Sequence, residues 1–150
     1  MRNTTQLPRI TVAAVIPDGS RFLLVEETID GRAVLNQPAG HLDAGESLIG
    51  AVIRETLEET AWQVRPVGLI GVYQLLLPQV HFVRITFLCD ALAHDSTRAL
   101  DSEIVRTHWL TRDEIADHSI PQRSSLVLRC IDDHLAGRLW PLEQIVEPLK

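Results

Sequence analysis

The chain has 150 residues, a length that fits one hydrophobic core, and we expect residues 1–150 to form a single domain. Hydrophobic residues make up 45% and charged residues 23%, which excludes a disordered or collagen-like protein. Since 20 acidic residues outnumber 14 basic ones and the net charge is −6, a long nucleic acid is not an expected partner.

The cysteines and the N-terminal sequence indicate a cytoplasmic protein. Cys89 and Cys130 lie in separate apolar segments without the short spacing of a zinc or redox motif, so we expect buried free thiols. The first apolar run, Ile10–Ile16, is too short to cross a membrane. The N-terminus also lacks the basic start and small-residue cleavage site of a signal peptide.

The first third of the chain has the pattern of short strands. Ile10–Ile16 and Phe22–Val25 are rich in apolar and β-branched residues, and the turn-forming residues Pro17–Ser20 separate them. This arrangement predicts a β-hairpin. Val34–Pro38 is expected to be extended, because a proline disfavours helical geometry in the residue before it.

Ser47–Thr60 changes to a helical period. Five residues are expected on one side of this helix: Leu48, Ile49, Val52, Ile53 and Thr56.

Beyond the helix, three strands and two helices are predicted. Val67–Leu77 and Val80–Leu92 read as long strands joined by a turn, and Val105–Leu110 as another strand. Thr111–Ala116 resembles a capped helical turn, and Ser124–Leu135 an amphipathic helix that ends before Gly137. Together these elements predict an α+β fold with a mixed or antiparallel sheet.

Three glutamates on the predicted helix form the most informative feature of the sequence. Glu55, Glu58 and Glu59 are spaced i, i+3 and i+4, so their carboxylates share one face and repel one another. A solvated acidic face is the structural alternative. It would normally include lysines, whereas Arg54 is the only cation in this segment. One cation does not neutralise three acids, which favours a metal site.

Carboxylate ligands suit Mg²⁺, with Mn²⁺ as an alternative, whereas Zn²⁺ prefers histidine and cysteine. Because Mg²⁺ is usually shared between carboxylates and substrate phosphates, this helix predicts a site that handles a small phosphorylated molecule.

At this point the sequence resembles the Nudix family. The residues of its motif are present at full spacing: Gly40, Glu46, Arg54, Glu55, Glu58 and Glu59. The resemblance implies an α/β/α sandwich with a mixed β-sheet and a hydrolase that cleaves phosphoanhydrides.

The resemblance also implies a role for each residue of the motif. Glu55, Glu58 and Glu59 correspond to the metal ligands, with the backbone carbonyl of Ala39 as a further ligand. Arg54 corresponds to the arginine that positions the first of these glutamates. Glu46 corresponds to a glutamate that supports the loop before the helix.

Two positions depart from the family pattern. Ala61 stands where the family usually has glycine, and alanine adopts left-handed geometry at a cost of roughly 1–2 kcal/mol, so the helix end is expected to differ. Thr56 stands where the family usually has an aliphatic residue. Neither departure removes an expected ligand.

The resemblance extends beyond the motif to one bacterial branch of the family, in Val25–Ile29, Asn36–Leu42, Arg123–Ser124 and Trp140–Glu143. That branch implies nucleoside di- and triphosphates, thiamine diphosphate and hydroxymethylpyrimidine diphosphate as substrates. Damaged nucleotides or dinucleoside polyphosphates remain alternatives, as does a module that senses a nucleotide or ADP-ribose without turnover. The expected assembly is a monomer or a homodimer.

Four residues outside the glutamate set are weaker candidates. Glu103 is a candidate general base or ligand, with an ordinary surface glutamate as the alternative. Arg84 and Arg123 are candidate phosphate contacts, although an outward-facing Arg84 is an equal alternative. His41 adjoins the motif and is a candidate substrate contact or a structural residue. Four aromatic residues are expected in the core: Trp62, Tyr73, Phe82 and Trp109.

Overall fold

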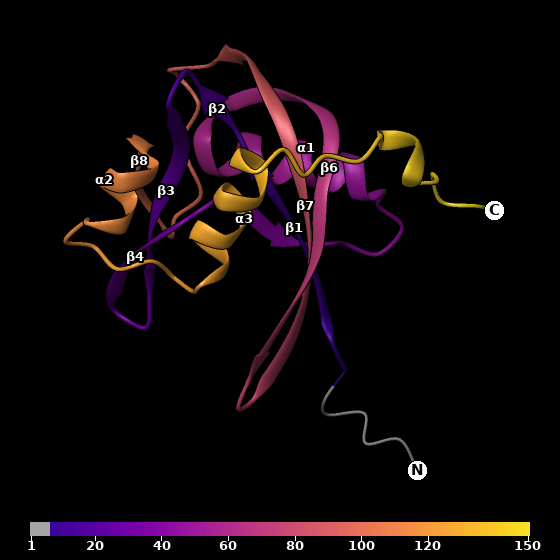
Figure 1. Cartoon of the computed structure of the whole chain (residues 1–150), viewed down its shortest axis with the longest axis horizontal. Helices are drawn as coiled ribbons and strands as arrows, with labels where there is room; N and C mark the ends of the chain where they lie inside the picture. Colours follow the sequence, from indigo (N-terminus) through magenta and orange to yellow (C-terminus); the bar gives the residue numbers. More distant parts are fainter. Residues whose placement is uncertain (1–6) are drawn as a thin grey trace.

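The computed structural model describes residues 7–150, in which two four-stranded β-sheets pack against three α-helices (Figure 1). The strands are β1 (Arg9–Val15), β2 (Pro17–Asp18), β3 (Arg21–Ile29), β4 (Arg32–Asn36), β5 (Ala39–His41), β6 (Trp62–Leu77), β7 (Val80–His94) and β8 (Ile104–Thr111). The helices are α1 (Leu48–Thr60), α2 (Arg112–Ala116) and α3 (Leu126–Leu135), followed by a 3-10 turn, η2 (Leu142–Gln144).

The first sheet is mixed and has the order β5-β1-β7-β6. β1 runs parallel to β7, whereas β5 and β6 are antiparallel to their neighbours. Side chains alternate across a strand, so Val12 and Ala14 join the core under α1, while Val15 joins the core under α3. Helices α1 and α3 therefore cover opposite faces of the first sheet, which confirms the expected α+β fold with a mixed sheet.

The second sheet consists of β2, β3, β4 and β8, and its arrangement corrects one expectation. β1 and β3 do not form the predicted hairpin along their length. Only the short β2 turns back on β3, pairing Pro17 with Phe22, while β1 enters the first sheet beside β7. An apolar strand pattern reports burial but does not identify the partner strand, and here the chain changes sheets between Val15 and Pro17.

Helix α1 matches the prediction closely. Ser47 caps its N-terminus by accepting a hydrogen bond from the Gly50 amide at 2.9 Å. At the other end Ala61 adopts φ 61°, and its amide donates to the Leu57 carbonyl at 2.9 Å. The expectation that this helix end would differ is therefore wrong. Alanine takes the left-handed conformation that glycine usually supplies.

Thr56 is fully buried on α1, and its hydroxyl lacks a hydrogen-bond partner within residues 7–150. A buried polar group without a partner costs about 1–3 kcal/mol. We therefore expect Thr56→Val, which keeps the shape and removes the hydroxyl, to raise the free energy of unfolding by about 1 kcal/mol in urea titrations.

Thr60→Val is the matched control for Thr56→Val. The Thr60 hydroxyl donates to the Thr56 carbonyl at 2.6 Å and accepts from the Trp62 amide at 3.1 Å. Its removal is expected to destabilise the protein. A Thr56→Val variant that is also less stable than the wild type would contradict the assignment of an unsatisfied hydroxyl.

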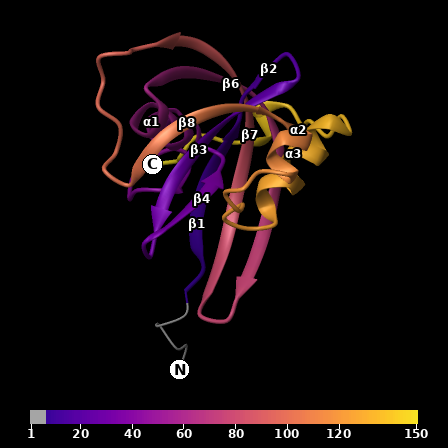
Figure 2. The ribbon, with the colours of Figure 1, turned by 90° about the vertical axis from the view of Figure 1, so that its left-hand side faces the viewer.

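The far ends of β6 and β7 form a long hairpin arm that projects beyond the rest of the molecule, as both ribbon views show (Figures 1 and 2). Near the middle of β6, the C-terminal segment crosses its edge where Leu69 and Trp140 exchange backbone hydrogen bonds. Among the helices of residues 7–150, none combines the length and apolar character needed to cross a membrane.

Candidate active site

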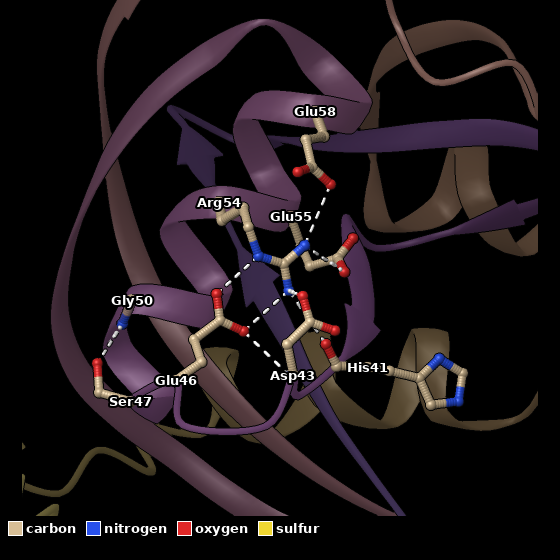
Figure 3. A network of polar contacts seen from close by, with 8 residues as sticks. All are labelled: His41, Asp43, Glu46, Ser47, Gly50, Arg54, Glu55 and Glu58. Atoms are coloured by element: carbon tan, nitrogen blue, oxygen red, sulfur yellow. Dashed lines mark hydrogen bonds and ion pairs between the residues drawn. The ribbon is translucent and has the colours of Figure 1, made fainter. Parts of the chain in front are cut away.

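Arg54 lies at the centre of a polar network on the outer side of α1 (Figure 3). Its Nε donates to Glu46 at 2.6 Å, and its Nη1 contacts Glu55 at 3.0 Å and Glu58 at 3.2 Å. Hydrogen bonding to Glu46 is the main cause that raises the pKa of Arg54, so the guanidinium stays charged. One arginine thus fixes the directions of several carboxylates.

The loop before α1 is held by the same network. Glu46 accepts from the Asp43 amide at 3.2 Å and from Arg54 Nη2 at 2.9 Å, while Asp43 lies 3.3 Å from that guanidinium. The His41 carbonyl accepts from Arg54 at 3.2 Å. Glu46 therefore contacts both the loop and the helix, the arrangement that its supporting role requires.

Glu55 and Glu58 meet a third carboxylate, Asp101, whose oxygens lie within 4.8 Å of theirs. The Asp101 amide donates to the Glu58 carbonyl at 3.0 Å, which fixes the loop before β8 against α1. Sequence reasoning named Glu103 from this loop but missed Asp101, because nothing in the sequence indicates that Asp101 reaches the helix.

Glu59 lies apart from this cluster, deeper in the molecule and only 7% exposed. Its Oε1 accepts a hydrogen bond from the Ala39 amide at 2.7 Å. Burial raises the pKa of Glu59 to about 9, and burial also raises the pKa of Glu55. Carboxylates that are crowded and desolvated in this way favour a nearby cation, so the residues present fit a hard divalent metal ion.

The approach of β5 to α1 leaves no room for a side chain at Gly40. A Cβ atom at this position would collide with the carboxylate of Glu55. The glycine therefore lets Glu55 lie directly against the backbone of β5.

A cavity of about 450 Å³ opens beside the acidic residues, between the two sheets. It brings together seven of the candidate site residues: Ala39, His41, Glu55, Glu59, Arg84, Glu103 and Arg123. Asp101 also lines it, whereas Arg54 and Glu58 are not among the lining residues.

Arg84 points inward, which excludes the outward-facing alternative. It is 7% exposed, and its guanidinium donates to Gln37 Oε1 and Asn36 Oδ1, each at 3.1 Å. Burial lowers the pKa of Arg84 from its ordinary value. Both partners are neutral amides, so neither hydrogen bond pairs the guanidinium with a carboxylate. A buried cation therefore lines the cavity.

Arg123 reaches the same cavity from the segment before α3. Its Nη1 donates to Glu27 at 2.8 Å, and Glu27 also accepts from Asn36 Nδ2 at 3.3 Å. Sequence reasoning did not anticipate Asn36, Gln37 or Glu27 in this network, because β3, β7 and the segment at the end of β4 meet only in the folded chain.

The aromatic residues differ in their environments. Trp62 and Trp109 are partly buried against one core cluster, and Tyr73 against the other, in agreement with the prediction. Phe82 is different, because it lines the cavity, and the expectation that it belongs to the core is wrong. Cys89 and Cys130 are buried free thiols, as predicted.

Residues 7–129 match the family model for the NUDIX domain. Phosphatase NudJ from Escherichia coli (strain K12) is 40% identical over 139 residues, which cover 92% of this chain and 90% of that protein.

Solved structures agree with this result. A NUDIX hydrolase from Nitrosomonas europaea superposes with a TM-score of 0.90 at 42% identity, covering 93% of this chain and 97% of that one. A MutT NUDIX hydrolase from Burkholderia pseudomallei, with a TM-score of 0.73 and 21% identity over 85% of this chain and 98% of that one, shares the fold. The chain therefore belongs to the Nudix family and is one of its hydrolases.

Proposed function

We propose that this chain is a Mg²⁺-dependent hydrolase that cleaves phosphoanhydride bonds in nucleoside di- and triphosphates and in small organic diphosphates such as thiamine diphosphate or hydroxymethylpyrimidine diphosphate. One observation carries the proposal: three carboxylates, from Glu55, Glu58 and Asp101, meet beside a cavity that also contains the buried cation of Arg84. The likeness to a bacterial phosphatase over most of the chain supports it.

Glu55, Glu58 and Asp101 would hold the metal ion, together with Glu59 and the Ala39 carbonyl on its inner side. A bound Mg²⁺ would polarise a phosphoryl oxygen and lower the pKa of a bound water molecule. Arg54 acts through two of these ligands, because its guanidinium contacts both Glu55 and Glu58 and holds their carboxylates in place.

Arg84 and Arg123 would bind the phosphate groups from the other side of the cavity. A guanidinium can donate two parallel hydrogen bonds to a phosphate, and Arg84 is already fixed by two amide oxygens, so little side-chain entropy is lost on binding. We assign Glu103, an exposed carboxylate that lines the cavity, as the group that accepts the proton of the attacking water molecule. His41 would contact the substrate at the cavity rim.

A substrate panel tests the proposal. We expect the purified protein to release phosphate or pyrophosphate from thiamine diphosphate, GDP and GTP when Mg²⁺ is present, and to stop when EDTA removes the metal. Restoring Mg²⁺ should restore the rate, and Mn²⁺ should substitute for it.

The same panel distinguishes a module that senses nucleotides from an enzyme. Binding of these ligands without any turnover would reject the proposed hydrolysis. Turnover confined to damaged nucleotides or dinucleoside polyphosphates would keep the hydrolase but reject the proposed substrates.

A further inference from the structure

The hairpin arm presents an apolar surface to the cavity. Leu75 pairs with Phe82 across β6 and β7, and both residues line the cavity, as does Leu77. Alternate residues of a strand point to the same face, so Phe82 and Arg84 lie side by side on β7, separated by about 6.6 Å along the strand. One face of the arm therefore places an aromatic ring next to the buried cation.

A second ring faces Phe82 from β5. The ring centroids of His41 and Phe82 are 6.4 Å apart, and their planes are inclined by 54°. Both residues line the cavity. The two rings come from β5 and β7, the strands on either side of β1. They form an aromatic wall of the cavity next to the hairpin arm and beside Arg84, the proposed phosphate-binding arginine.

Several polar side chains of the cavity already have partners. Asn36 bonds to Glu27 and Arg84, Glu27 also accepts from Arg123, and Ser124 accepts from the Leu126 amide at 3.2 Å. Because these side chains already take part in hydrogen bonds within the protein, they are poorly placed to recognise the hydrogen-bond donors and acceptors of a ligand. The apolar arm offers instead a surface for the flat face of a ring, and stacking of this kind tolerates different bases because each has such a face.

We propose that Phe82, together with His41, Leu75 and Leu77, forms a ring subsite that binds the flat aromatic group of a substrate while Arg84 binds its phosphates. This proposal rests on the proposed function of the same cavity. It assigns to the arm the selection of aromatic diphosphates over aliphatic ones. It also implies that different aromatic rings bind with similar affinity, since the subsite contacts their faces.

The test compares aromatic and aliphatic diphosphates in Phe82 variants. We expect Phe82→Ala to raise KM about tenfold for thiamine diphosphate and CDP. The kcat for both should stay nearly constant, because the ring lies away from the phosphorus under attack. Isopentenyl diphosphate, which has no ring, should show an unchanged KM. Phe82→Tyr, which keeps the ring, should restore the wild-type KM.

Leu76→Ala is the matched control, because Leu76 belongs to the same arm but is 73% exposed and does not line the cavity. It should leave KM unchanged for both classes. An equal change in KM for aromatic and aliphatic diphosphates in Phe82→Ala, or no change in either, would overturn the ring subsite.

Calorimetry with the monophosphate products separates this proposal from the proposed function. Thiamine monophosphate and CMP should bind about tenfold more weakly to Phe82→Ala, whereas isopentenyl monophosphate should bind equally well to both proteins. If Phe82→Ala weakens binding of the aromatic monophosphates alone, and the protein hydrolyses none of the diphosphates, the proposed hydrolysis is rejected and the ring subsite is supported. Equal affinities for all three ligands in both proteins would reject the subsite even if turnover is normal.

Discussion

Glu58→Gln and Glu59→Gln, made separately, are expected to lower kcat by orders of magnitude while the protein stays folded. The amide keeps the shape of each side chain but removes the negative charge that the proposed Mg²⁺ requires. In Glu59→Gln the amide oxygen can still accept the hydrogen bond from Ala39, so the local fold should persist. Steady-state kinetics with thiamine diphosphate and thermal unfolding together give both results.

Glu143→Gln is the control for these two substitutions, because Glu143 is an exposed glutamate outside the cavity. It removes the same charge and should leave kcat and the melting temperature unchanged. Near-normal turnover in both Glu58→Gln and Glu59→Gln would show that the acidic residues of α1 do not carry the reaction.

Gly40→Ala is expected to abolish most of the activity with little loss of stability. The added Cβ would occupy the position of the Glu55 carboxylate, which must then leave its present place near Glu58 and Asp101. A long glutamate side chain can rotate at small cost, whereas displacing a catalytic group by about 1 Å can cost 10²-fold in rate. We therefore expect kcat to fall by about 100-fold and the melting temperature to stay nearly constant.

Gly19→Ala gives the opposite pattern and serves as the matched control. Gly19 has φ 58°, and a Cβ there would meet no atom within 4 Å. The strain of left-handed alanine should lower the stability by about 1–2 kcal/mol, while the activity is retained. If Gly40→Ala keeps full activity, the close packing of β5 against the Glu55 carboxylate is not required for the reaction.

The elements whose signals are local were predicted well from the sequence. Helix α1 was expected over Ser47–Thr60 and spans Leu48–Thr60, because apolar period and capping lie within the segment itself. Strand β6 begins at Trp62, five residues before its predicted start at Val67, and β5 at Ala39–His41 is a strand that the sequence pattern does not predict. These segments depend on pairing with β7 and β1, which local sequence does not reveal.

The candidate site was predictable to the extent that it lies on one helix. The spacing of Glu55, Glu58 and Glu59 predicts that the three residues share one face of the helix. Glu59 nevertheless occupies a more buried position than its neighbours. Asp101 and the amide partners of Arg84 come from distant segments, so their positions depend on the packing of the two sheets. Phe82 was misplaced because an aromatic residue in an apolar strand has the same pattern whether it faces a core or a cavity.

Ala61 shows how a departure from a family pattern can leave the structure unchanged. The left-handed cap persists without glycine because the amide of Ala61 still bonds to Leu57, and its side chain is buried. Burial of the methyl group and this hydrogen bond offset part of the backbone strain.

A crystal structure with Mg²⁺ and a non-hydrolysable diphosphate analogue would show whether the acidic residues of α1 bind the metal ion beside the substrate. We expect density for the ion among the carboxylates of Glu55, Glu58 and Asp101, with the analogue's phosphates between this ion and Arg84. An ion bound elsewhere, with these carboxylates free in solvent while the analogue occupies the cavity, would contradict it.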